Sequence, residues 1–319
     1  MRTRSDRLVA VATLGAFVVV AGVLGLVSLY LGAVTQAMSG VPRTASLPDY
    51  DGRPAAQQAD GNRAVRYLVL VTDEKGALAS AYLAHLTAAR DALHLIGLPA
   101  NLLVSDPHGM DATLSSQFAQ APAAAVRAIE GLVDVRVDHL VQVDLDGFTR
   151  IIDVLGGVTV DNRTQIAAEG WHFGAGELRL TGDKALIYLS TSTHSMTRLE
   201  RTEAVFVEIV RGMASGDALT NPAKVESIGS VLNSCVVVDA ALTPGEIRRM
   251  ALDMHLTSDA VTGTPLPLAG LSELRGTQVI VPDTDRIKQL TTALHTDQVK
   301  RWSAGQTGLW QPLPELRPR

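Results

Sequence analysis

Cysteine is scarce in this chain, with Cys235 the single one among 319 residues. A disulfide needs two cysteines, so we expect a domain that its hydrophobic core holds together without a disulfide framework. Cys235 opens the apolar run 235–238, which favours a buried structural thiol over a reactive one. Aromatic residues are also few, at 4%, whereas hydrophobic residues reach 46%. This composition is sufficient for one sizeable core.

Basic clusters are missing after the first seven residues, and the formal net charge is −5. Nucleic-acid binding depends on a concentrated positive surface, so we expect no nucleic-acid partner. The chain also lacks a GxSxG elbow, a phosphate-binding P-loop and a zinc-ligand cluster. An independent hydrolase or ATPase therefore has no support.

Charge of either sign is absent from positions 8–42, and residues 8–34 are almost wholly apolar. About 20 apolar residues span a bilayer, so this segment predicts one transmembrane helix. Three arginines in residues 1–7 place that end in the cytoplasm and the rest of the chain outside the cytoplasmic membrane. The competing interpretation is a cleaved signal peptide with a weak site at Ala37, but the length of the run favours an uncleaved single-pass anchor.

A composition change follows the predicted span. Residues 39–62, SGVPRTASLPDYDGRPAAQQADGN, are rich in Pro, Gly, Asp and Gln and hold few large apolar side chains. We therefore predict a flexible linker over residues 35–63. Order should begin at Val65, giving one extracytoplasmic domain over residues 64–297 and a C-terminal tail over residues 298–319.

The segment 138–161, DHLVQVDLDGFTRIIDVLGGVTVD, predicts a compact strand–helix–strand unit. Its first strand ends at Asp144, and Asp146 is placed to cap the helix that follows. Gly156 and Gly157 should end that helix, because glycine accepts the positive φ of a helix C-terminus.

Strand and helix patterns alternate along the rest of the chain, which indicates a layered α/β domain. Further strands are predicted at 66–73, 92–98 and 278–281. Further helices are predicted at 122–133, around 185–189, from the capping-box pattern Thr197–Glu200 onward, at 243–255, and through Leu294. Residues 81–90 are rich in alanine and would pass for a helix on propensity alone.

Several segments in this order resemble the LytR–CpsA–Psr family, bacterial envelope proteins that move lipid-linked glycopolymers onto the cell wall. The matching segments are AAVRAIEGLVDVRVDHLVQVDLDGFTRIIDVLGGVTVD, GELRLTGDKALIYL, TRLERTEAV and TQVIVPDTDRIKQLTTAL. The resemblance covers roughly residues 65–296. It implies a single layered α/β domain with a mixed central sheet and flanking helices, and it makes residues 81–90 the first arm of a β-hairpin that turns near Ala89–Arg90.

The resemblance also implies a site. Family members bind a polyprenyl pyrophosphate, with the lipid in an apolar tunnel between sheet and helices, arginines on the pyrophosphate and acidic residues on a magnesium ion. Guanidinium suits phosphate because it is a rigid and always charged fork of donors. Carried onto this sequence, the resemblance assigns phosphate binding to Arg198, Arg201 and Lys75, catalysis to Asp73 and Arg198, and the magnesium ion to Asp73.

At other site positions this chain departs from the family. Family arginines or aspartates are replaced at Ala79, Ala81, Ala100, Asn101, Ser190 and Ser192. The missing carboxylate at position 81 leaves Asp73 without the partner that magnesium needs. Each lost charge-assisted hydrogen bond removes about 1.5–3 kcal/mol, so transfer activity should fall steeply.

Histidines are the remaining candidates to refill the site. His85 and His94 fall on apolar strands, a position typical of core residues, and His108 follows a turn. His194 lies in the polar run Ser190–Ser195, which is typical of a loop that leads into the next helix.

Two functions therefore stay open. The first is a membrane-anchored envelope protein that binds a polyprenyl-linked glycopolymer or wall ligand with weak or no transferase activity. The alternative is an active phosphotransferase that attaches lipid-linked glycopolymers to peptidoglycan with a reduced clamp of Arg198, Arg201, Asp73 and Lys75. The family's older label of transcriptional attenuator is disfavoured as direct DNA binding, because the domain is predicted to lie outside and has no basic patch.

Overall fold

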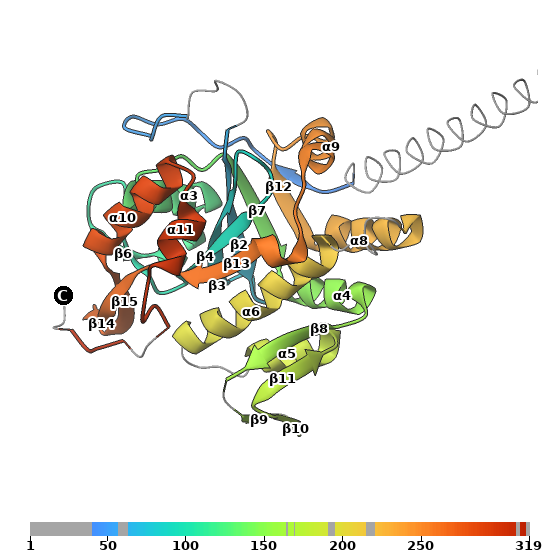
Figure 1. The fold of residues 1–319 in the computed structure, drawn as a ribbon. Helices are drawn as coiled ribbons and strands as arrows, with labels where there is room; N and C mark the ends of the chain where they lie inside the picture. The colour runs from blue at the N-terminus through green and yellow to red at the C-terminus, as the bar shows by residue number, and fades with distance from the viewer. Residues whose placement is uncertain are drawn as a thin grey trace, which may run out of the picture.

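The computed structural model in Figure 1 describes residues 40–56, 63–163, 165–168, 170–190, 195–214, 221–310 and 313–316. Within these ranges no helix is both long and apolar enough to cross a membrane. The predicted span over residues 8–34 lies outside them, so the anchor stays a prediction.

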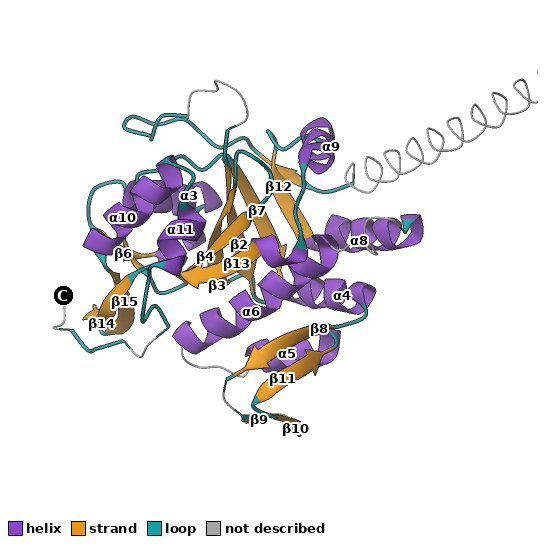
Figure 2. Ribbon diagram, in the orientation of Figure 1, coloured by secondary structure: helices purple, strands orange, loops and turns teal. Residues whose placement is uncertain are grey.

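A mixed sheet of seven strands forms the centre of the described domain (Figure 2). In spatial order its strands are β1 (Arg43–Thr44), β12 (Val236–Asp239), β7 (His139–Asp144), β2 (Val65–Thr72), β3 (Leu78–Leu86), β4 (Leu93–Pro99) and β13 (Val261–Pro265). β2 is parallel to β7 and antiparallel to β3, which makes the sheet mixed. This is the α/β architecture that the sequence predicted.

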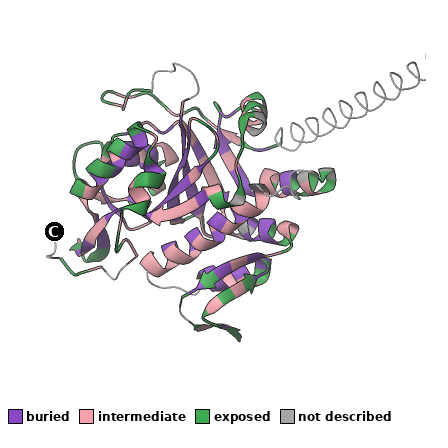
Figure 3. Cartoon of the chain, in the orientation of Figure 1, coloured by how far each residue is buried: buried purple, intermediate pink, exposed green. Residues whose placement is uncertain are grey.

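Helices cover both faces of the sheet, so side chains along each strand alternate between two cores (Figure 3). Val69 and Tyr82 belong to the core on the face that we call the α6 face, and Leu68 and Leu83 to the core on the α3 face. The helices of the α6 face are α4 (Leu145–Leu155), α5 (Gly182–Ser190), α6 (Ser195–Ala214) and α8 (Pro222–Cys235). Those of the α3 face are α2 (Leu114–Gln120), α3 (Pro122–Val133), α10 (Thr284–His295) and α11 (Val299–Ala304).

Short elements complete the domain. They are α9 (Pro244–Asp253), the 3-10 turn η1 (Ser258–Ala260), and the antiparallel pairs β8 (Val158–Asn162) with β11 (Gly176–Leu180), β9 (Ile166–Ala168) with β10 (Trp171–Phe173), β5 (Leu103–Ser105) with β6 (Asp111–Thr113), and β14 (Leu268–Leu274) with β15 (Thr277–Pro282).

The predicted strand–helix–strand unit is β7, α4 and β8, with one correction. The Asp144 carboxylate accepts a hydrogen bond from the Gly147 N–H at 3.2 Å, so Asp144 rather than Asp146 caps α4. Gly156 has φ 81° and Gly157 φ 103°, as predicted. Their N–H groups donate to the carbonyls of Asp153 and Ile152, the paired bonds of a Schellman helix end.

Two further helix starts test the capping patterns. The helix predicted to start at Thr243 is confirmed as α9, which begins at Pro244 with Thr243 and Glu246 in a capping box. The Thr197–Glu200 pattern was wrong as a cap, because α6 already begins at Ser195 and Thr197 lies inside its first turn. The predicted hairpin is confirmed, since β3 turns back into β4 with Arg90 at φ 60°.

The predicted linker is the largest departure from expectation. Residues 40–56, which we call the strap, lie along the domain instead of hanging free. Their strand β1 pairs in parallel with β12, and Val41 is buried. Farther along, Tyr50 and Arg53 reach the carboxylate of Glu130 in α3. A buried carboxylate requires such partners. These contacts therefore order a polar segment whose composition had predicted a flexible linker.

The C-terminal tail also belongs to the domain. Val299 of α11 is buried in the core of the α3 face. Beyond α11 the chain returns to β14, where the Leu316 N–H donates to the Leu271 carbonyl at 2.6 Å. The edge of β14 offers unpaired backbone groups, and the tail satisfies them.

Candidate functional site

The predicted site lies where several strands end at one edge of the sheet. β2 and β7 are parallel, and their last residues, Thr72 and Asp144, are paired. β3 starts at the same edge, where Ser80 pairs with Pro99 at the end of β4. Leu199 of α6 lies against Gly97 of β4, so the N-terminal part of α6 approaches this edge on the α6 face. The carboxyl ends of strands commonly carry binding residues in open α/β sheets.

Asp73 and Lys75 occupy the tight turn between β2 and β3. One carboxylate oxygen of Asp73 accepts hydrogen bonds from the Lys75 and Ala77 N–H groups, both at 2.9 Å. This oxygen therefore holds the turn closed. Lys75 is exposed at the tip of the hairpin.

Magnesium is a poor fit to this turn. Ala81 stands where a second carboxylate would be needed, and it is buried in the core of the α3 face. Among the residues that the structure describes, no three acidic, His or Cys side chains gather in a possible metal site. Asp73 has one oxygen left for a cation, whereas hard cations such as Mg²⁺ prefer several oxygen ligands.

Arg201 and Arg198 come from the first two turns of α6. The Arg201 guanidinium lies 5.2 Å from the centre of the Tyr188 ring, and its Nη1 donates to the Tyr188 carbonyl at 3.4 Å. The Tyr188 hydroxyl in turn donates to Asn162 at 3.1 Å. Burial raises the pKa of Tyr188, so this ring stays neutral. Tyr188 and Asn162 thus hold the Arg201 fork in place before any ligand arrives.

Arg198 is half-buried one turn earlier, and its carbonyl accepts a hydrogen bond from the Thr202 hydroxyl at 2.8 Å. Residues three apart share a face of a helix, so Arg198 and Arg201 can reach one anion. Glu200, between them in sequence, forms an ion pair with Arg163 at 2.8 Å. Arg163 could not be singled out from sequence patterns, because its partner Glu200 lies 37 positions away in the chain.

Glu203 is a buried acidic residue near the site that no pattern in the sequence singled out. It is 4% exposed on the side of α6 that meets the sheet. A β-carbon at Gly97 or Gly263 would lie 2.6 or 2.5 Å from its carboxyl oxygens, so these two glycines make room for it. Burial, with the nearby Glu200 charge, raises the pKa of Glu203 well above its usual range and keeps it neutral. Glycine in two neighbouring strands was the only signal of a close approach.

Two more polar groups lie buried on β3 next to Glu203. Tyr82 is fully buried, and burial raises the pKa of its hydroxyl well above its usual range. Ser80 is 1% exposed. The interface between α6 and the sheet is therefore polar near the site and apolar farther along, where Phe206 contacts the Tyr82 ring.

The substituted positions carry little that could replace the missing charges. Ala100 is half-buried after β4, and the exposed Ser190 hydroxyl donates to the Ile187 carbonyl at the end of α5. Ser192 and His194 lie outside the described residues.

The other histidines do not join the site. His85 contacts Asp297 at 2.7 Å and His94 contacts Thr262 at 2.7 Å, both from buried positions. Burial lowers the pKa of His94 to about 4. His108 is exposed in the turn between β5 and β6. The core interpretation of His85 and His94 is confirmed.

Comparisons with known proteins agree with this architecture. The model of the LytR_cpsA_psr family matches residues 70–296. A teichoic acid transferase, TagU of Halalkalibacterium halodurans, is 28% identical over 138 residues, which is 41% of this chain and 45% of the relative. That match spans less than half of the relative's length. Among solved structures, Bacillus subtilis TagV is 18% identical with a TM-score of 0.63, covering 75% of this chain and 98% of TagV. TagT bound to LIIa-WTA is 15% identical with a TM-score of 0.60, covering 80% and 99%.

Proposed function

Because this chain belongs to the LytR_cpsA_psr family, we propose that it is a membrane-anchored envelope protein whose outer domain binds a polyprenyl-(pyro)phosphate-linked glycopolymer. Its transferase activity is weak or absent, and peptidoglycan is its second ligand. The relative TagU is named a polyisoprenyl-teichoic acid–peptidoglycan transferase, and the TagT complex holds LIIa-WTA. Both names support a lipid-linked wall polymer as the ligand class.

The observation that supports a phosphate ligand is the fixed guanidinium of Arg201, which lies one helical turn after Arg198. Tyr188 orients Arg201 through its ring and its carbonyl, so little side-chain freedom remains to be lost on binding. A planar, permanently charged fork suits phosphate oxygens. The anion would lie at the opening turns of α6, where backbone N–H groups and the helix dipole add favourable charge.

The reduced activity follows from what surrounds these arginines. Phosphoryl transfer requires neutralisation of charge on the phosphate oxygens. Asp73 commits one oxygen to its turn, Ala81 is buried on the far face, and Ser190 is uncharged. Removing one electrostatic donor from a transition state commonly costs about 10²–10³ in rate, and several are missing here.

The anchor is supported by the apolar segment 8–34, which is long enough to span a bilayer. A phosphatase reporter fused after Arg319 should be active outside the cytoplasmic membrane. Activity confined to a cytoplasmic reporter at the same position would contradict the anchored topology.

The ligand is tested by titrating the full-length chain with a polyprenyl phosphate. Arg198→Ala should weaken binding by about 1.5–3 kcal/mol, roughly 10-fold to 150-fold, with little effect on folding. Arg163→Ala is the matched control, since it removes an exposed guanidinium that pairs with Glu200 instead. Arginine restored at Ala100, Ser190 and Ser192 should strengthen binding. If neither the wild type nor the restored chain binds, the proposed ligand is wrong.

An assay of magnesium-dependent polyprenyl pyrophosphate release from a lipid-linked glycopolymer distinguishes a binding protein with weak or no transferase activity from an active phosphotransferase. We expect little release by the wild type and more by the restored chain. Equal and rapid turnover by both would favour the active phosphotransferase.

A further inference from the structure

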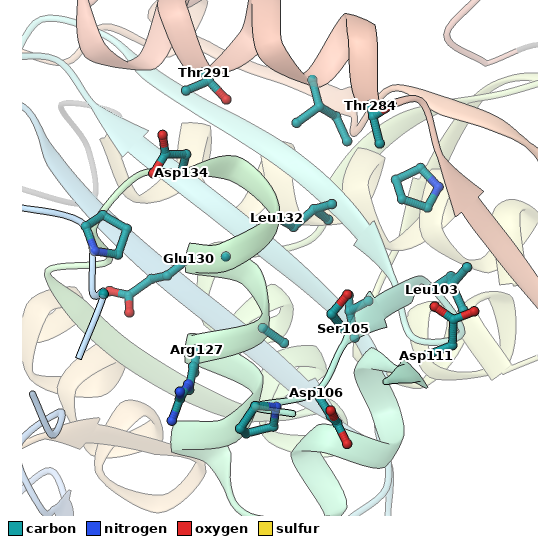
Figure 4. A pocket seen from close by; sticks show the side chains of 18 of the residues that line it. Leu103, Ser105, Asp106, Asp111, Arg127, Glu130, Leu132, Asp134, Thr284 and Thr291 are labelled. Atoms are coloured by element: carbon teal, nitrogen blue, oxygen red, sulfur yellow. The ribbon is translucent and has the colours of Figure 1, made fainter. Parts of the chain in front are cut away.

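A second concave surface lies on the α3 face, away from the arginines of α6. Its volume is about 770 Å³, within the range of small-ligand and peptide sites. Figure 4 shows it between α3, which carries Arg127 and Glu130 and is followed by Asp134, and α10, which carries Thr284 and Thr291. The turn that joins β5 to β6 closes one end and the strap closes another. We call this surface the strap cleft.

The strap wall of this cleft is a feature of this chain outside the family match, which starts at residue 70. It is also rigidly held. The Tyr50 hydroxyl donates to Glu130 at 2.7 Å, and the Arg127 guanidinium lies 4.5 Å from the centre of the Tyr50 ring. Arg53 donates to both Glu130 oxygens at 3.1 Å. A wall fixed in this way presents its side chains to a ligand without an ordering cost.

The charge of the lining is predominantly negative. Five acidic residues line the cleft, Asp51, Asp106, Asp111, Glu130 and Asp134, against two basic ones, Arg127 and Lys288. Arg53 pairs with Glu130, and the remaining lining residues still include more acidic than basic side chains. Lys288 forms an ion pair with Asp285 at 3.0 Å. Such a cleft repels phosphate and attracts cationic groups.

The floor of the cleft is apolar. Leu103, Leu132, Val281 and Ile287 contribute to it, and Ser105 and Thr284 add hydroxyls at the sides. Met110 belongs to the same β5–β6 turn and is 57% exposed, the most exposed large hydrophobic side chain among the described residues. An apolar floor below an acidic rim matches a side chain with a long methylene stem and a cationic head.

We propose that the strap cleft binds a peptide segment that carries lysine or arginine side chains. The stem of a basic side chain would cover Leu132 and Ile287, while its charged head would reach Asp51 or Asp134 at the rim. Specificity would come from charge complementarity and from exclusion of anionic polymers. This inference rests on the proposed function only for the location of the peptide, which would lie outside the membrane. The phosphate site plays no part in peptide binding.

The test uses the full-length chain and a fluorescein-labelled Ala-Lys-Ala-Lys-Ala peptide in fluorescence anisotropy. Counter-probes replace both lysines by glutamine or by glutamate. The double variant Asp51→Asn, Asp134→Asn should bind the lysine peptide about fivefold to tenfold more weakly. Both side chains are exposed, and asparagine tolerates the left-handed backbone of Asp134, at φ 48°, so folding should persist.

Two further variants sharpen the result. Lys288→Gln should strengthen binding, because it removes a rim cation that repels the peptide. Asp253→Asn, an exposed carboxylate on α9, is the matched control and should change nothing. The proposal is overturned if the wild type binds the glutamine peptide as tightly as the lysine peptide, or if the rim variant binds the lysine peptide unchanged. Arg198→Ala should leave peptide binding intact, so failure of the phosphate site and failure of the strap cleft are separable.

Discussion

Two glutamates are buried on opposite faces of the same sheet, and the protein accommodates them in opposite ways. Glu130 is fully buried on the α3 face and receives the Tyr50 hydroxyl, the Arg53 guanidinium and the Val137 N–H. Glu203 is buried on the α6 face, its Oε2 has no hydrogen-bond partner, and burial raises its pKa well above the usual range. One carboxyl group is balanced by partners and the other by a proton. The comparison shows that burial alone does not determine the charge of an acid.

The largest effect should follow from removing the cation beside Glu130. Arg53→Met leaves a buried carboxylate without its guanidinium, and we expect the free energy of unfolding to fall by about 3–5 kcal/mol. Urea unfolding measures this difference. Asp49→Ala is the control, because Asp49 is an 80% exposed partner of the same arginine and should cost almost nothing. Equal effects from the two variants would mean that Glu130 does not depend on Arg53.

The second effect concerns the proton on Glu203. Its folded pKa is raised above the value of 4.5 expected in the unfolded chain, so the folded state holds more protons above pH 4.5. Stability should therefore fall as pH rises, by about 1.4 kcal/mol per pH unit until the folded pKa is reached. His94 acts in the opposite direction, but only between about pH 4 and 6.5, because burial lowers its pKa to about 4.

Unfolding free energies of the wild type and Glu203→Gln between pH 6.5 and 8.5 isolate this contribution. The wild type should lose stability as pH rises through this range, and Glu203→Gln should remove most of that loss. Parallel profiles would show that Glu203 is ionised in the folded protein.

A smaller effect should appear where glycine makes room for Glu203. Gly263→Ala places a β-carbon against the carboxyl group and should destabilise by about 1–3 kcal/mol. In a Glu203→Ala background the same change should cost less, since the obstructing atoms are gone. A double-mutant cycle by thermal unfolding gives the coupling, and strict additivity would exclude the contact.

The smallest effect should come from the neutral partner of Glu130. Tyr50→Phe removes one hydroxyl donor and leaves Arg53 in place, so we expect a loss of about 1 kcal/mol in urea unfolding. A loss as large as that of Arg53→Met would mean that the strap is held chiefly by Tyr50.

Local patterns in the sequence were sufficient for much of the fold. The β7–α4–β8 unit, the glycine turn at Gly156 and the start of α9 after Thr243 each depend on residues within a few positions of one another. The strap was missed because Tyr50 meets Glu130 80 positions away, and composition cannot report such a contact. The start of α6 lies three residues before the start predicted from the Thr197 cap, because a capping pattern is only one of several possible helix starts.

The sequence predicted which residue types belong to the candidate site but not how their side chains are arranged. Arg201 is charged and near a helix start, as expected, but its fixation by Tyr188 depends on the packing of α5 against α6. Asp73 was expected to face a cation, whereas one of its oxygens closes a turn. Glu203 would pass for a solvent-exposed helix residue in any sequence pattern, because the two glycines that admit it lie on β4 and β13.

The short strand β1 has one more consequence. β12 would otherwise be the last strand on its side of the sheet, with backbone groups open to another chain. Pro42 accepts the Val238 N–H at 3.0 Å, and Arg43 and Thr44 lie alongside β12 in parallel. Proline and a long charged side chain on an outermost strand discourage further strand addition. The strap thus shields one margin of the sheet from self-association, and a chain shortened past Thr44 should form intermolecular β-aggregates more readily than the intact protein.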